Sequence, residues 1–235
     1  KPPLAVKILG FDTSGVSGSI ALSEDGRLMA ETETWDVGTH SQWFLPAVDS
    51  LLQENSVKME DIGLFAVGIG PGSFTGLRIG VSAVKGFAWA LGKKCVSVST
   101  LEAMAINGMA DGRRICPVLD ARKKEVYAAL FSCEDGRLKR LTKDGVMLPH
   151  EVADMIADNG DGPVVFLGGG IEIYGEIILN AVKNASIGPK QSWMPRGRVI
   201  CSLGFEARNE ARDPEAISPV YLRKSEAELK AEQSS

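Results

Sequence analysis

A glycine-rich segment, GIGPGSFTGLRIG, spans residues 68–80 and has the residue types of a phosphate-binding loop. It lies between an apolar run and a long apolar-patterned segment, so a strand, a glycine loop and a helix N-terminus would meet there. The free N–H groups and the dipole of a helix N-terminus attract anions. The spacing nevertheless matches neither nucleotide motif, because no Gly-Lys-Ser or Gly-Lys-Thr is present and Thr75 stands where a third glycine would. The segment therefore predicts a sharp turn into a helix that is capped by Ser73 or Thr75.

Two aspartates, Asp12 and Asp120, occupy matching places in two similar stretches of the chain. ILGFDTSGVSGSIALSEDGRL, residues 8–28, resembles ICPVLDARKKEVYAALFSCEDGRL, residues 115–138. Each stretch has an apolar strand that ends in the aspartate, then a second strand, then EDGRL. The Asp-Gly pair within EDGRL predicts a tight hairpin, because both turn positions need a positive φ. Each half of the chain is therefore expected to open with three antiparallel strands.

The remainder of each half alternates helical and strand patterns. The first half has helical patterns at residues 40–54, 74–91 and from 101, with strands at 64–68 and 95–98. The second half has helical patterns at residues 150–157, 171–183 and 203–212, with a strand at 164–167. Two copies of this order predict an α/β protein with two tandem lobes, each a mixed sheet with helices. We expect the lobes at residues 1–110 and 111–222, and a flexible tail at 223–235.

The helix predicted over residues 74–91 has two stripes of side chains. An apolar stripe runs beside a stripe of small residues, Gly76, Gly80, Ala83, Gly86 and Ala90. A glycine inside a helix costs about 1 kcal/mol relative to alanine, and close approach to another helix would compensate for that cost. The helix over residues 40–54, with a capping box at Thr39 and Gln42 and a kink or start at Pro46, is the nearest candidate. The two helices either pack on their own sheet or form a subunit interface.

Composition limits the class of protein. The chain of 235 residues has a net charge of −4 and a pI near 5.4, which argues against binding nucleic acid through its own field. Its four cysteines form no CxxC pair and are expected to be reduced, buried thiols rather than zinc ligands. No apolar run approaches the ~20 residues of a membrane span, and the first residues lack the pattern of a signal peptide. These features favour a cytoplasmic protein.

Duplicated lobes with an aspartate in the first hairpin resemble the ribonuclease H-like/actin-like superfamily of actin, hexokinase and Hsp70. In that superfamily ATP lies between the lobes, and the first hairpin of each lobe contacts phosphates. The resemblance implies nucleotide contacts at Asp12, Thr13, Ser14, Asp120, Gly168, Gly169 and Gly170. The three glycines could instead make only a tight strand-to-helix turn. In the second hairpin the bulky Arg122, Lys123 and Lys124 would crowd a γ-phosphate, although their charge could hold a phosphate from another subunit.

Several short runs resemble signatures of the bacterial TsaB family, also called YeaZ. The main ones are residues 70–80 with Lys85-Gly86 and then STLEA at 99–103, and Asp120-Ala121-Arg122 with Glu125-Val126-Tyr127. Asp12-Thr13-Ser14, His40-Ser41, Leu45-Pro46 and Tyr221-Leu222-Arg223 agree as well. The resemblance covers nearly the whole chain and is stronger in its first half.

The TsaB resemblance implies a role in making N6-threonylcarbamoyladenosine at position 37 of tRNA. In that family's pathway TsaD, working with TsaB and TsaE, transfers the threonylcarbamoyl group, and TsaB is a non-catalytic paralogue whose first-lobe helices are buried against TsaD. We therefore expect TsaD and TsaE as partners, a homodimer in isolation, and contact with tRNA only indirectly through the complex. The expected interface comprises Trp43, Phe44, Val48, Phe74, Thr75, Gly76, Leu77, Arg78, Gly80, Val81, Ala83 and Val84.

The residue types also favour a non-catalytic protein. TsaD-like proteins carry a His-x-x-x-His metal pair, and the matching positions here are Thr100 and Met104, which cannot replace imidazole ligands. The only histidines, His40 and His150, lie in two different helix starts. No nucleophile, base and orienting residue form a convincing set, so a glycoprotease-like peptidase is disfavoured. We expect no catalytic residue, no metal and no required cofactor, with ATP or ADP only at a shared interface. An autonomous ATPase or small-molecule kinase is the alternative.

Overall fold

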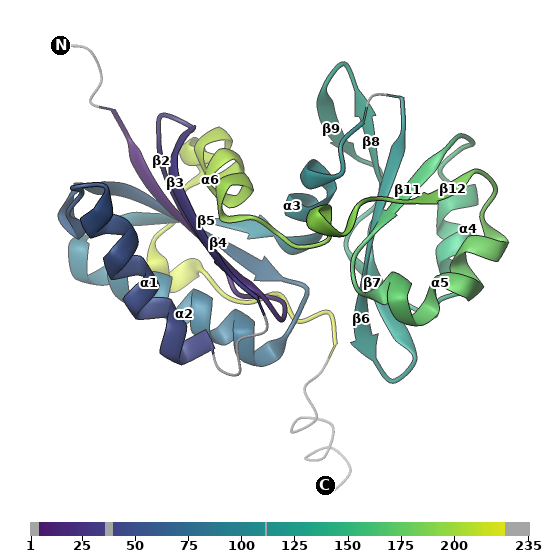
Figure 1. The fold of residues 1–235 in the computed structure, drawn as a ribbon, viewed down its shortest axis with the longest axis horizontal. Helices are drawn as coiled ribbons and strands as arrows, with labels where there is room; N and C mark the ends of the chain where they lie inside the picture. The colour runs from purple at the N-terminus through teal and green to yellow at the C-terminus, as the bar shows by residue number, and fades with distance from the viewer. Residues whose placement is uncertain (1–4, 36–39, 111, 224–235) are drawn as a thin grey trace, which may run out of the picture.

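The chain forms two lobes, each built on one β-sheet, which lie side by side in the computed structural model (Figure 1). The structure describes residues 5–35, 40–110 and 112–223. The predicted capping box at Thr39 and the predicted tail from residue 224 onward lie outside these ranges. Within the described ranges, no helix combines the length and the hydropathy that crossing a membrane would need.

The first sheet has five strands, in the order β3-β2-β1-β4-β5. Their bounds are β1 Lys7–Asp12, β2 Gly18–Glu24, β3 Arg27–Thr34, β4 Ile62–Gly70 and β5 Lys94–Ser99. Strands β1 to β3 pair antiparallel, whereas β4 and β5 run parallel to β1. The turn between β2 and β3 has the positive φ angles that its sequence predicts, 49° at Asp25 and 78° at Gly26. The expected mixed sheet with an antiparallel opening is confirmed.

The second sheet repeats this order, except that two of its strands are each divided into two short strands. Its strands are β6 Arg114–Arg122, β7 Glu125–Ala128, β8 Phe131–Glu134, β9 Arg137–Arg140, β10 Gly145–Met147, β11 Val164–Leu167 and β12 Ala185–Ile187. Strands β7 and β8 both pair antiparallel with β6, β10 pairs with β7, and β9 pairs with β8. Strand β11 pairs parallel with β6, and β12 pairs parallel with β11. The break lies at Leu130, whose backbone N–H donates to Thr142 Oγ1 at 2.8 Å. The two lobes therefore share one topology, and the predicted α/β fold is confirmed.

Helices cover both faces of the first sheet (Figure 1). On one face lie α1 (His40–Glu54) and α2 (Phe74–Leu91), and on the other lies α6 (Gly197–Glu206). Alternate residues of β1 divide in the same way, since Leu9 and Phe11 pack with α1 and α2 whereas Ile8 packs with α6. Helix α1 continues through Pro46 rather than starting there.

Helix α6 crosses from the second half of the chain to the first sheet. The helical pattern near residues 203–212 is expected within the second lobe, but the helix starts at Gly197 and packs on the first sheet. Gly10 of β1 permits this packing, because a Cβ there would lie 2.6 Å from Cys201 Sγ. The apolar spacing indicates the helix, but it carries no information on which of two similar sheets the helix covers.

The second sheet also has helices on both faces. On one face lie α4 (Glu151–Ala157) and α5 (Gly170–Ala181), and on the other lies α3 (Thr100–Asn107). Helix α3 joins the lobes, because Ala103 packs with the first sheet and Leu101 and Met104 pack with the second. Four single-turn 3₁₀ helices complete the described elements: η1 Met59–Asp61, η2 Lys190–Ser192, η3 Arg208–Glu210 and η4 Pro214–Ala216.

The last described segment, residues 212–223, returns along the first lobe and is called the C-terminal strap below. Cys95 and Arg212 exchange backbone hydrogen bonds of 2.9 Å. Ile217 is buried with the core of α1 and α2, and the N–H of Val220 donates to the carbonyl of Ile69 at 2.8 Å. The strap therefore closes the first lobe before the chain reaches the β6–β7 hairpin of the second lobe.

Candidate functional site

The first hairpin loop, Asp12-Thr13-Ser14, is buried at the end of β1. The three residues are 1%, 1% and 3% exposed. Asp12 Oδ1 accepts hydrogen bonds from the backbone N–H and the hydroxyl of Ser14, at 2.9 and 2.8 Å. Thr13 Oγ1 donates to the carbonyl of Gly76 at 2.7 Å, and the carbonyl of Ser14 accepts from the N–H of Ser73 at the same distance. The polar groups of this loop are thus largely engaged within the chain.

The glycines of residues 68–80 make room for that loop. A side chain at Gly68 would collide with the Asp12 carboxylate, and one at Gly76 or Gly80 would collide with Thr13. The expected use of Gly76 and Gly80, close approach to another helix, is therefore corrected: they admit a hairpin of their own lobe. A stripe of small residues shows that something approaches closely, but its spacing does not say what.

The N-terminus of α2 is occupied by its own chain. Ser73 is the helix cap, as predicted, and its Oγ accepts from the N–H of Gly76 at 3.3 Å. The Phe74 ring stacks on Tyr221 of the C-terminal strap, with ring centroids 4.6 Å apart. Arg78, a member of the expected interface, donates through Nε to Tyr221 Oη at 3.1 Å. A phosphate bound at this helix end would have to displace these contacts.

Burial raises the pKa of the Asp12 carboxyl to about 7, although the two hydrogen bonds from Ser14 act in the opposite direction. Its Oδ2 atom has no hydrogen-bond partner among the described residues. The Asp12 carboxyl therefore lies buried beside Gly68, with one oxygen held by Ser14.

The second hairpin keeps one hydrogen bond of the first, from a backbone N–H to the aspartate, but lies at the surface. Asp120 Oδ1 accepts from the N–H of Arg122 at 2.9 Å, which matches the contact between Asp12 and Ser14. Asp120 also accepts from Tyr174 Oη at 3.4 Å, and the Arg122 guanidinium lies 3.4 Å from its Oδ2. The two loops therefore share this aspartate contact and differ in backbone conformation, burial and charge.

The three glycines at 168–170 form a tight turn from β11 into α5. Gly168 has a φ of 102°, a conformation that favours glycine. A side chain at Gly168 or Gly170 would collide with the carbonyl of Val118 on β6, whereas Gly169 has open space around it. The turn interpretation is therefore supported. The predicted nucleotide residues form two clusters, one around Asp12 in the first lobe and one around Asp120 and Gly168 in the second.

The positions that match the TsaD-type metal histidines lie in the core. Thr100 and Met104 are both fully buried on α3, and a Cβ at Gly168 would lie 2.8 Å from the Met104 methyl group. Met104 thus packs an apolar side chain against the second lobe. Within residues 5–35, 40–110 and 112–223, no cluster of three or more His, Cys, Asp or Glu could hold a metal ion.

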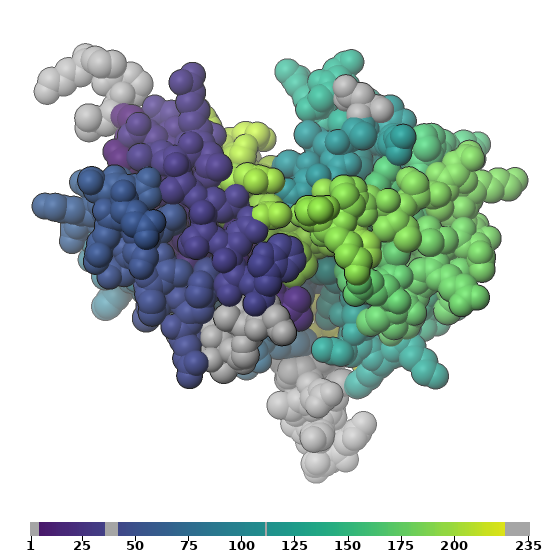
Figure 2. All heavy atoms as spheres, viewed as in Figure 1, coloured from purple at the N-terminus to yellow at the C-terminus, as the bar shows by residue number. Residues whose placement is uncertain are grey.

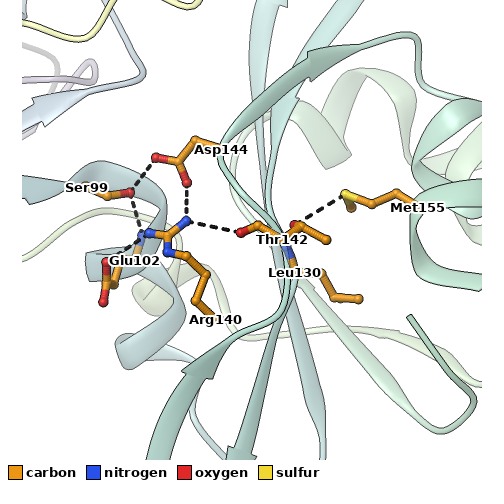
Figure 3. Close-up of polar contacts among 7 residues, drawn as sticks. All are labelled: Ser99, Glu102, Leu130, Arg140, Thr142, Asp144 and Met155. Atoms are coloured by element: carbon orange, nitrogen blue, oxygen red, sulfur yellow. Dashed lines mark hydrogen bonds and ion pairs between the residues drawn. The ribbon is translucent and has the colours of Figure 1, made fainter. Parts of the chain in front are cut away.

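A polar network beside α3 joins the two lobes and has no clear signal in the sequence (Figure 3). Arg140 of β9 donates to Glu102 Oε2 at 2.9 Å and to Asp144 Oδ1 at 2.5 Å. Ser99, the cap of α3, donates to Asp144 Oδ2 at 2.7 Å. The Arg140 guanidinium also lies 4.6 Å from the centre of the Phe131 ring. The N-terminus of α3 is therefore fixed to the second sheet by charge as well as by apolar packing.

Most of the expected partner interface lies inside the first lobe. The expected interface residues that are buried within this chain itself are Phe44, Val48, Gly76, Leu77, Gly80, Val81 and Val84. Thr75 and Arg78 are exposed, and Trp43, Phe74 and Ala83 are half-buried. The apolar spacing of α1 and α2 thus mainly identifies the side that packs on the sheet.

The outer side of α1 and α2 carries apolar surface that the sequence pattern did not single out. Trp89 is 74% exposed and Leu45 is 56% exposed. A groove of about 460 Å³ runs beside Leu45 and is lined by Leu45, Val48, Asp49, Leu52, Gln53, Val57, Lys58, Met59, Glu60 and Phe87. A Cβ added at Gly86, on the same helix as Trp89, would meet no atom within 4 Å. We call this surface the outer helix face, defined by Leu45, Gly86, Trp89 and the groove.

Comparison with known proteins adds a family context. The family model described as TsaD, tRNA N6-adenosine threonylcarbamoyltransferase, matches residues 37–231. The tRNA threonylcarbamoyladenosine biosynthesis protein TsaB of Bacillus subtilis (strain 168) is 35% identical over 224 residues, which cover 95% of this chain and 96% of that protein. TsaB of Escherichia coli (strain K12) is 29% identical over 237 residues, covering 94% and 96%. The solved structure described as YeaZ from Pseudomonas aeruginosa superposes with a TM-score of 0.80 at 30% identity, over 92% of this chain and all of that one.

Proposed function

Because the chain belongs to the TsaB family of tRNA threonylcarbamoyladenosine biosynthesis proteins, we propose that it is the non-catalytic subunit that binds and supports TsaD. TsaD transfers the threonylcarbamoyl group to adenosine 37 of tRNA, with TsaE as the third partner. In this proposal the chain acts in the cytoplasm and contributes a docking surface rather than a reacting group.

The outer helix face is the observation that carries the proposal. A monomer rarely exposes a tryptophan by 74% on one helix and an apolar groove on the neighbouring helix, and such surfaces mark protein contacts. Because Gly86 has no side chain, the backbone of α2 is accessible next to Trp89, and a second helix could approach it closely. The proposed interface therefore moves from the buried side of α2 to its outer side, and it keeps Thr75, Arg78 and Ala83 from the expected set.

The residues of α3 support the non-catalytic part of the proposal. Thr100 and Met104 stand where TsaD-like proteins have metal-binding histidines, and both are fully buried. Neither a thioether in a packed core nor a threonine can hold an ion as two imidazoles do. An autonomous ATPase or kinase is not favoured, because the first hairpin uses its polar groups internally. A nucleotide, if one is involved, would bind at a surface shared with TsaD.

The test is genetic complementation combined with direct binding. In a bacterium that lacks its own TsaB, this chain together with its cognate TsaD and TsaE should restore N6-threonylcarbamoyladenosine, measured by mass spectrometry of digested tRNA. Calorimetry with purified cognate TsaD should show a stoichiometric complex, and light scattering should show that the complex replaces a homodimer of this chain. Modified tRNA without any complex, or a complex without modification, would contradict the proposal.

A further inference from the structure

The turn between β6 and β7, formed by Arg122, Lys123 and Lys124 and called the basic turn below, has an unusual backbone. Its three residues have φ angles of 63°, 51° and 67°. Residues other than glycine rarely adopt this left-handed backbone conformation, and three such residues in succession are disfavoured. The surrounding structure must therefore hold the turn in place.

The C-terminal strap supplies that hold. Arg223 Nη1 donates to the carbonyls of Ala121 and Arg122 at 2.8 and 3.1 Å, and it lies 3.1 Å from the carboxylate of Glu125. From the other side, Asp120 accepts from the N–H of Arg122. The Arg223 side chain is only 17% exposed, so these contacts are largely shielded from water. Hydrogen bonds from Arg223 and to Asp120 thus hold the backbone of the turn.

The side chains of the basic turn point outward with a surplus of positive charge. The Arg122 side chain is 87% exposed, and both lysines are exposed. The two acidic residues of this hairpin are already engaged, Glu125 by Arg223 and Asp120 by Arg122 and Tyr174. Neither lysine makes an ion pair with any described residue. The matching loop of the first lobe, Asp12-Thr13-Ser14, is buried and carries no basic residue.

The shape of the turn selects among anionic ligands. Small anions and nucleotides bind in concave sites, whereas this turn is the projecting end of a hairpin at the lower edge of the second lobe (Figures 1 and 2). The grooves described in the structure lie elsewhere, along α1 and beside Arg196. Adjacent cations on a projecting turn suit phosphates spaced along a nucleic-acid backbone, and they read no base.

We propose that the basic turn contacts backbone phosphates of the tRNA when the chain is part of its complex with TsaD. This inference rests on the proposed function, and it departs from the expectation that tRNA is reached only indirectly. Because the chain as a whole has a charge of −4, the turn cannot hold RNA by itself and adds to a site that TsaD provides.

The test compares two double variants in the assembled complex. K123Q/K124Q removes two charges from the basic turn, and K139Q/K183Q removes the same charge from exposed positions on β9 and after α5. Fluorescence anisotropy with labelled tRNA gives the dissociation constant at several salt concentrations. K123Q/K124Q should weaken binding roughly 5- to 50-fold at low salt and lower the slope of log K against log salt by about 1 to 2, because roughly one ion is released for each phosphate contact. K139Q/K183Q should match the parent chain.

Assembly is measured by light scattering before tRNA is added, so that the two proposals can fail separately. If both variants assemble with TsaD and bind tRNA with the parent's affinity and salt slope, the contact with tRNA is refuted and the proposed function stands. If K123Q/K124Q fails to assemble, the turn is a protein contact and the inference is wrong. If the parent chain itself does not bind TsaD, both proposals are wrong.

Discussion

Thr13 Oγ1 donates a hydrogen bond of 2.7 Å to the carbonyl of Gly76, 63 positions further along the chain. That contact explains the glycine-rich segment better than a ligand does. The first hairpin is inserted against the first turns of α2, and the glycines there make the space. A segment that looks like a binding loop is thus one half of an internal packing contact.

Two glycines of α2 should respond in opposite ways to substitution. Gly80→Leu would drive a side chain into Thr13 and should lower the free energy of unfolding by about 3 kcal/mol or more. Gly86→Ala adds a methyl group in open space and should raise it by about 1 kcal/mol, because alanine is the better helix former. Urea denaturation measures both. Equal effects at the two sites would contradict the assignment of Gly80 to the interior and Gly86 to the surface.

Gly86→Trp tests the outer helix face as the partner surface. Because Gly86 is exposed and a Cβ there meets no atom within 4 Å, the fold should persist, but the ring would obstruct a helix packed against α2. We expect cognate TsaD to bind at least tenfold more weakly by calorimetry, with an unchanged circular dichroism spectrum. Glu176→Trp, which adds the same ring to an exposed position on α5, is the matched control and should bind normally. Normal binding by both variants would remove the outer helix face from the interface.

Trp89→Ala tests the same surface by removal. Exposed tryptophans at protein contacts often account for a large share of the binding energy, so truncation should cost about 2 kcal/mol in TsaD affinity. Because the side chain is 74% exposed in the isolated chain, the free energy of unfolding should change by less than about 0.5 kcal/mol. A variant that loses stability without losing affinity would place Trp89 in a structural role instead.

The pH dependence of stability should report the buried Asp12 carboxyl. Its pKa is about 7 in the folded chain and 3.8 when unperturbed, so the unfolded state loses its proton first as the pH rises. This group therefore lowers the free energy of unfolding by up to about 1.4 kcal/mol per pH unit between those values and has no further effect above pH 7. Asp12→Asn cannot titrate. The stability of the variant relative to the parent should increase from pH 4 to pH 7 in urea denaturation and then level off, whereas a constant difference would refute the buried carboxyl.

The Arg140 network should contribute to the contact between the lobes. Arg140→Leu would remove the guanidinium that pairs with Glu102 and Asp144, and it should lower the free energy of unfolding by about 1–3 kcal/mol. A double-mutant cycle with Glu102→Gln should show coupling between the two sites. Lys190→Met, which breaks an exposed pair with Glu172, is the control and should cost less than about 1 kcal/mol. An Arg140 effect no larger than the Lys190 effect would show that the network adds nothing.

The antiparallel strands that open each lobe could be predicted from sequence because their signals are local. Asp25-Gly26 and Asp135-Gly136 specify hairpin turns through their φ angles, and Ser73 specifies the start of α2 through a cap three residues long. The repeated EDGRL established the correspondence of the two halves. The family resemblance also rests on short runs of residues, and the comparisons confirm it.

Long-range packing was beyond the reach of the same signals. The apolar spacing of α6 was visible, yet the helix covers the sheet of the other lobe. The small residues of α2 were visible, yet Gly76 and Gly80 receive Thr13, and only Gly86 faces outward. The Arg140 network was not predicted, because Glu102 lies on α3, 38 positions before Arg140 in the chain.

The sequence by itself therefore determined the duplicated α/β topology, the helix cap and the family, since each depends on contacts between residues that are near in the chain. The tertiary structure alone decided that the glycine-rich segment packs against Asp12-Thr13-Ser14, that the exposed side of α2 centres on Gly86 and Trp89, and that the basic turn is held by Arg223. The physical reason is that periodicity specifies which side chains share a face, whereas the surface that covers a face is chosen by the packing of the whole chain.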